Sequence, residues 1–146
     1  MRKANYDKFP STKLTGMLVQ GWDSIISMLK EKMDARKVLA VDLYTGVYEE
    51  EVLDAFSKEF SGRVMNVRDL MKPEKEIQAL TERFMTEDVL FGYVTNLKLE
   101  DYLDVDKVAA ARKQISEAKD AIVIIGTGAS VVAPQDAMVV YADMAR

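Results

Sequence analysis

The sequence predicts a three-layer α/β fold in which crossover helices cover a mostly parallel sheet. Short apolar runs alternate along the chain with longer segments of helical periodicity, as in parallel α/β sheets. The runs at 38–41 and 121–125 are apolar without alternation, which is typical of strands covered on both faces. The chain has 146 residues, enough for one domain with its own core.

The first half of the chain predicts two helices and two strands. Residues 13–20 are compatible with a short hairpin or edge strand. Apolar residues spaced four, three and four apart predict a helix over 22–33. A strand at 38–41 precedes a helix at 47–60, which a glycine ends, and a second strand follows at 63–67.

The middle of the chain is harder to assign. Pro73 suits the first position of a helix whose apolar stripe consists of Ile77, Leu80 and Phe84. Residues 88–104 mix strand-like and acidic segments, so they form either a short strand or a loop packed over the sheet edge.

The second half resumes the alternation of helices and strands. A helix over 105–118, capped by Asp104, leads to the most apolar strand at 121–125. A glycine loop follows, and no clear helix is expected after it because Pro134 interrupts the segment. Residues 137–144 form the final strand.

The domain organisation is simple. The sequence has no internal repeat, low-complexity segment or linker, so residues 1–146 are read as a single α/β domain. Because the chain stops directly after a strand, we expect it to be the N-terminal fragment of a longer protein.

Composition argues against several classes of site and partner. The chain has no cysteine and no histidine, which removes the usual zinc ligands and the commonest general base. The net charge is −4 and the basic residues are scattered, so neither nucleic acid nor an anionic membrane is an expected partner. The sequence lacks an apolar run of signal-peptide or membrane-span length, so we expect a cytoplasmic protein.

The loop after the first strand has the layout of a phosphate-binding loop without its chemistry. Tyr44, Thr45 and Gly46 form a tight turn, but the lysine and the second glycine of a P-loop are missing. Three glutamates at 49–51 complement the macrodipole of the following helix and would repel a phosphate from its amides. A capped helix after a turn is favoured over a phosphate site.

The second glycine loop is the better candidate for a ligand. Gly126, Thr127, Gly128 and Ser130 follow a buried strand and could form an anion-binding nest of backbone amides. A structural loop remains the alternative, because position 131 is valine and the GxGxxG pattern is incomplete.

Other polar and aromatic side chains near strand ends leave two interpretations open. The polar residues could orient a ligand or form weak surface ion pairs, and they are Asp42, Arg68, Asp69 and Asp143. The aromatic residues could line a pocket or belong to the core, and they are Tyr44, Tyr48, Phe91 and Tyr93. We assign no catalytic residue and no metal ligand.

Four segments together resemble the N-terminal domain of bacterial class I mannose-6-phosphate isomerase-like proteins. They are RKVLAVDLYTGVYEEEVLDAF, FGYVTNLKLEDYLD, AIVIIGTGAS and VVYADMAR, which span most of the chain. The resemblance implies a downstream cupin domain as a partner, with zinc and the isomerase chemistry in that domain. This chain, which has no histidine, would carry no cofactor of its own.

The order of segments also resembles a P-loop kinase of the uridine-kinase type. VLAVD would match the strand before the phosphate loop, and AIVIIGTG a later strand that carries acidic ligands in such kinases. The chain lacks a Walker A motif, so the resemblance implies a degenerate relative that transfers no phosphate.

Three functional hypotheses follow. The first is a structural, regulatory or ligand-sensing accessory domain of a mannose-6-phosphate isomerase. The second is a stand-alone transferase that binds a nucleotide or sugar phosphate. The third is a protein-interaction module that binds a partner or itself through an exposed sheet edge. The candidate ligand-binding residues are Gly126, Thr127, Gly128, Ser130, Tyr44, Thr45, Gly46 and Arg68.

Overall fold

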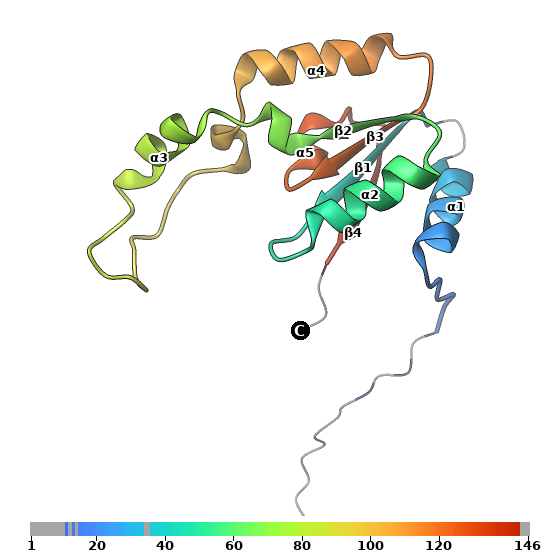
Figure 1. The fold of residues 1–146 in the computed structure, drawn as a ribbon, viewed down its shortest axis with the longest axis horizontal. Coiled ribbons are helices and arrows are strands. Elements are labelled where there is room, and N and C mark those ends of the chain that lie inside the picture. The colour runs from blue at the N-terminus through green and yellow to red at the C-terminus, as the bar shows by residue number, and fades with distance from the viewer. Residues whose placement is uncertain (1–10, 12, 14, 34–35, 144–146) are drawn as a thin grey trace, which may run out of the picture.

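The computed structural model describes residues 11, 13, 15–33 and 36–143 and has a three-layer α/β fold (Figure 1). The described residues form one sheet of four parallel strands in the order β2-β3-β1-β4. The strands are β1 (Val38–Leu43), β2 (Arg63–Asn66), β3 (Ile122–Gly126) and β4 (Met138–Ala142). The predicted fold class is confirmed, and the sheet of the described residues is wholly parallel.

Helices cover both faces of the sheet, as the unalternating strands predict. One face packs on α1 (Trp22–Met33) and α2 (Glu49–Glu59), and the other on α4 (Val105–Glu117) and the short α5 (Ala129–Val132). Every residue of β1 and β3 is buried. The core therefore consists of two apolar layers that these two central strands separate.

Local sequence signals account for the helices of these layers. In α1 the predicted stripe buries Ile26, Leu29 and Met33. The Asp104 carboxylate caps α4 by accepting hydrogen bonds from the amides of Asp106 and Lys107, both at 3.0 Å. The predicted cap is confirmed.

The chain leaves the two central strands toward opposite faces of the sheet. From β1 the chain crosses through α2 to β2, and from β3 it crosses through α5 to β4. Since α2 and α5 belong to different layers, β1 and β3 flank a topological switch point. Ligands of open α/β sheets bind at such a point, beyond the carboxyl ends of the strands.

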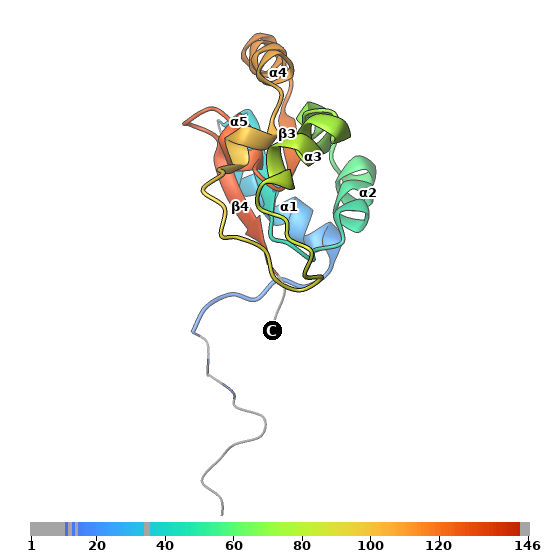
Figure 2. The ribbon, with the colours of Figure 1, turned by 90° about the vertical axis from the view of Figure 1, so that its left-hand side faces the viewer.

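A long segment of chain connects β2 to α4. We call residues 73–102 the arm; it contains α3 (Glu74–Glu82) and the 3₁₀-helix η2 (Leu99–Tyr102), and it follows the 3₁₀-helix η1 (Val67–Leu70). Its base is held by an antiparallel bridge between Met71 and Leu103. The arm projects past the sheet on the side toward which the strands point (Figures 1 and 2).

Several boundaries and elements differ from the sequence predictions. Residues 88–104 contain no strand, and the stretch 88–94 is exposed rather than packed on the sheet. A short helix, α5, does follow the glycine loop, because Pro134 comes only after its last turn. The described residues 13 and 15–20 form no strand. Leu14, Pro10 and the predicted strand end at Met144 lie outside the described residues.

Candidate functional site

The glycine loop after β3 is built around the carboxylate of Asp42. Asp42 lies near the carboxyl end of β1, opposite Gly126 in the register, and is only 8% exposed. It accepts hydrogen bonds from the backbone amides of Gly128 at 2.9 Å and Ser130 at 3.0 Å, and from the Ser130 hydroxyl. The amides therefore face an anion that the chain itself supplies.

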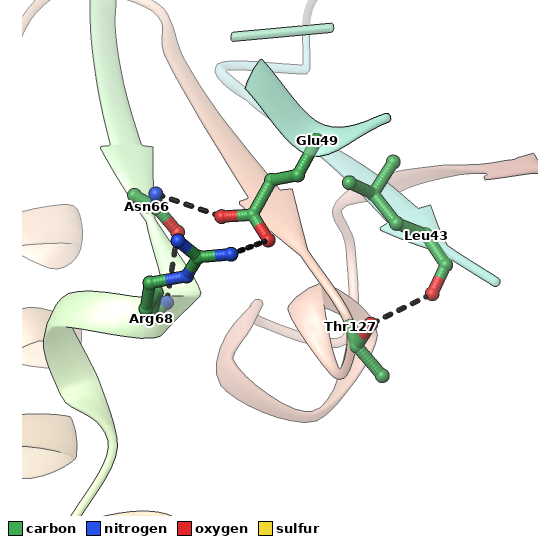
Figure 3. A network of polar contacts seen from close by, with 5 residues as sticks. All are labelled: Leu43, Glu49, Asn66, Arg68 and Thr127. Carbon is green, nitrogen blue, oxygen red and sulfur yellow. Dashed lines mark hydrogen bonds and ion pairs between the residues drawn. The ribbon is translucent and has the colours of Figure 1, made fainter. Parts of the chain in front are cut away.

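Backbone conformation explains the glycines of this loop. Gly126 has φ 135° and Gly128 has φ 87°, a region that side chains rarely adopt. The turn brings the loop amides toward β1, and the Thr127 hydroxyl donates to the Leu43 carbonyl at 3.0 Å (Figure 3). The loop and the end of β1 are thus joined by both backbone and side-chain contacts.

A second polar cluster lies at the ends of β1 and β2. The Glu49 carboxylate accepts from the Asn66 amide at 2.9 Å and pairs with the Arg68 guanidinium at 3.1 Å (Figure 3). The Asn66 side chain in turn accepts from the Arg68 backbone amide at 2.8 Å. Glu49 is 20% exposed and Arg68 is 64% exposed, so the guanidinium remains accessible to a ligand.

A pocket of about 310 Å³ lies between this cluster and the glycine loop. Its polar lining includes Glu49 and Arg68, and residues 126–128 of the glycine loop form another wall. The remaining lining is largely apolar and consists of Val67, Met71, Leu99, Tyr102 and Leu103. The pocket is at the carboxyl ends of the strands, beside the switch point.

The structure brings together only some of the predicted ligand-binding residues. Arg68, Gly126, Thr127 and Gly128 line the pocket. Ser130 faces Asp42 instead, through both its amide and its hydroxyl. The turn residues Tyr44, Thr45 and Gly46 are exposed and do not line the pocket.

Sequence reasoning missed two aspects of the site. Glu49 was interpreted only as a helix-end charge, yet its side chain binds Asn66 and Arg68. Asn66 was not considered, although an amide side chain at the end of a strand was the available signal. The structure also gives partners to two of the polar residues considered, since Arg68 pairs with Glu49 and Asp42 is buried in the loop.

The four aromatic residues considered for a pocket or core are all exposed. Their exposed fractions lie between 51% for Tyr44 and 78% for Tyr48, with Phe91 and Tyr93 on the arm. The expectation that they belong to the core is therefore wrong for all four. Aromatic content alone could not distinguish a core position from a protruding arm.

The described residues contain no cluster of three or more side chains suited to hold a metal ion, so they do not fit a zinc site. None of the helices in the described part combines the length and apolar character needed to cross a membrane.

Comparison with known proteins places the chain in a family. Residues 21–146 match the model of the domain of unknown function DUF8485, and the chain belongs to this family. No curated protein and no solved structure matches the sequence.

Proposed function

We propose that this protein is a non-catalytic, ligand-sensing accessory domain whose ligand binds in the pocket beside Arg68. The observation that carries the proposal is the position of Asp42. Its carboxylate occupies the amides that a phosphate would use, so we infer a structural role for the glycine loop and take the adjoining pocket as the candidate site at this end of the sheet.

The polar end of the pocket, formed by Glu49 and Arg68, suits a small ligand that carries hydroxyl groups. Arg68 and Glu49 offer donors and acceptors side by side, and their charges offset each other. A volume of about 310 Å³ lies at the lower end of the roughly 300–1,000 Å³ typical of ligand pockets. These properties suit a monosaccharide or its phosphate better than a nucleotide.

The resemblance to mannose-6-phosphate isomerase-like proteins supplies the biological setting of this proposal. In that setting the domain acts in the cytoplasm beside a cupin domain that carries zinc and the isomerase reaction. Sugar phosphates are therefore the first ligands to test. A transferase that binds nucleotides is the weaker alternative, since a chain of two or three phosphates needs more positive charge than Arg68, the one cationic side chain among the described residues that line the pocket, can supply.

Thermal unfolding with added ligand tests the proposal. The probes are mannose 6-phosphate, mannose and inorganic phosphate. A ligand at about 100 times its dissociation constant should stabilise the protein by roughly 2.7 kcal/mol. The variant Arg68→Ala should weaken binding about tenfold, equivalent to 1.4 kcal/mol.

Arg63→Ala provides the matched control, because Arg63 lies at the opposite end of β2 and does not line this pocket. It should leave binding unchanged. Failure of both sugar compounds to stabilise the protein, or equal losses in the two arginine variants, would rule the proposed ligand site out.

The arm supports an interaction module as a second candidate function. Met85, Val89, Leu90, Phe91, Tyr93 and Val94 are each at least 70% exposed. An apolar surface of this kind in a soluble protein commonly marks a contact site. The partner we propose is the cupin domain that the resemblance implies.

Sedimentation of this chain mixed with a zinc-dependent mannose-6-phosphate isomerase tests that contact. Phe91→Ser should abolish co-sedimentation, whereas Val105→Ser, which changes a similarly exposed residue outside the arm, should not. Co-sedimentation that persists in the Phe91 variant would exclude the arm as the contact surface.

A further inference from the structure

Strand β4 forms one edge of the sheet and is apolar along its whole length. Among the described residues it pairs with β1 alone. Met138, Val140 and Ala142 pack toward the layer of α1 and α2. Val139 and Tyr141 face the other side and are 44% and 75% exposed. Within the part of the chain that the structure describes, the edge thus combines an unpaired backbone side with uncovered apolar side chains.

The opposite edge of the same sheet is protected. Strand β2 has four residues, begins with the exposed Arg63 and runs directly into η1. Short length and charged side chains are the usual means by which proteins prevent edge strands from pairing. Strand β4, with the sequence MVVYA, has five residues and contains neither a charge nor a proline. Strand β4 therefore lacks the charged side chain that discourages pairing at the β2 edge.

We propose that the β4 edge pairs with a second copy of this chain, with the two β4 strands antiparallel about a two-fold axis at Val140. An isologous interface of this kind requires a self-complementary surface. In this register Val139 faces the partner's Tyr141, and Met138 faces the partner's Ala142. Pairs of a β-branched and an aromatic residue are favourable across antiparallel strands.

The distribution of charge supports a second copy as the occupant. The strand itself carries no charge that would select a peptide of opposite sign. Of the flanking acidic residues, Asp143 falls opposite the partner's Ala137 and not opposite another carboxylate. Within the described residues, the two-fold arrangement therefore places no two carboxylates directly opposite each other.

The interface is small. Each copy contributes one five-residue strand and the exposed side chains Val139 and Tyr141, which places the contact at the lower end of specific interfaces. We therefore expect a weak, reversible dimer that dissociates on dilution.

Sedimentation velocity over a series of protein concentrations tests the dimer. The wild-type chain should shift from monomer to dimer as its concentration rises, and Tyr141→Lys should remain monomeric. Val89→Lys is the matched control, because Val89 is 98% exposed on the arm and lies outside the proposed interface. A monomeric wild type, or dimers lost in the Val89 variant and kept in the Tyr141 variant, would overturn the proposal.

Cross-linking tests the register directly, since the chain contains no cysteine. Residues that face each other in antiparallel strands have Cα atoms about 4.5–5.5 Å apart, within the range of a disulfide. Val140→Cys should therefore form a covalent dimer on mild oxidation, and Val105→Cys should not. If Val140→Cys fails to fold, a mixture of Val139→Cys and Tyr141→Cys chains replaces it. A reversible dimer without the expected cross-link would overturn the β4 pairing.

Discussion

Asp42 determines the conformation of the glycine loop through three hydrogen bonds. A buried carboxylate is costly unless donors surround it, and the amides of Gly128 and Ser130 with the Ser130 hydroxyl provide them. No buried side-chain nitrogen or oxygen atom of the described residues lacks a hydrogen-bond partner. The loop is therefore stabilised by a charge from a strand 86 residues earlier in the chain.

Removal of this carboxylate should destabilise the protein. Asp42→Ala leaves two loop amides without their acceptor, and we expect a loss of roughly 2–4 kcal/mol in the free energy of unfolding. Urea denaturation measures the loss. The control, Ser130→Ala, removes only the hydroxyl contact and should cost about 1 kcal/mol. Equal stability of wild type and Asp42→Ala would contradict the role assigned to Asp42.

The vacated amides should accept an anion from solution. Formate has the carboxylate that Asp42→Ala lacks, so it should raise the melting temperature of that variant more than that of the wild type. A differential scanning fluorimetry series in formate, with matched ionic strength in the reference samples, measures the difference. The same response in both proteins would show that the amides do not form an anion site.

Individual residues were predictable from sequence where their partners are local. The cap at Asp104 follows from residues two and three positions later. The Asp42 contacts join distant segments, and so does the pairing of Glu49 with Arg68. Sequence placed Asp42 and Arg68 near strand ends, but the order of strands was needed to identify their partners.

At the scale of elements, apolar periodicity predicted where helices form more reliably than it predicted whether their apolar faces are buried. The stripe of α1 is buried as expected. The stripe predicted for the next helix is only half-buried at Ile77, Leu80 and Phe84; α3 ends at Glu82, before Phe84, and has no buried residue. An amphipathic pattern specifies a helix with an apolar face, but it does not specify what covers that face.

The turn from β3 into α5 should be more sensitive to a side chain at Gly126 than at Gly128. A Cβ atom at Gly126 would lie 2.8 Å from the Val67 Cβ, at a φ of 135°. We expect Gly126→Ala to cost roughly 3 kcal/mol from steric overlap and backbone strain together.

Gly128→Ala is the control for this turn. Its Cβ would meet nothing closer than the Leu99 Cδ1 at 3.8 Å, so only the strain of φ 87° remains, about 1 kcal/mol. Thermal or urea unfolding of both variants compares them. A Gly128 variant less stable than the Gly126 variant would contradict the packing described for this turn.

At the scale of the molecule, the sheet with its two helical layers holds the core, and the arm lies outside it. Buried residues occur on both sides of the arm, at Leu70 and Leu103, and none occurs within residues 73–102. The base of the arm is closed by the Lys72 amide, which donates to the Tyr102 carbonyl at 3.0 Å. The domain should therefore fold without the arm.

Replacement of residues 74–98 by a short glycine-rich turn tests this independence. The paired base brings the two ends of the arm together, and closing a shorter loop costs less entropy. The free energy of unfolding should therefore stay within about 1 kcal/mol of the wild-type value. For comparison, Phe56→Ala, at a position 1% exposed in α2, should cost roughly 3–5 kcal/mol. Loss of cooperative unfolding in the arm variant would show that the arm contributes to the core.

The central claim is that a small ligand binds in the pocket beside Arg68 while Asp42 holds the glycine loop closed to phosphate. Amide chemical shifts measured by NMR during titration with mannose 6-phosphate test it most directly. We predict shifts at Arg68 and at residues 126–128, with Tyr44, Thr45 and Gly46 unaffected. Shifts confined to those three turn residues, or no shift at the pocket at saturating ligand, would contradict the account.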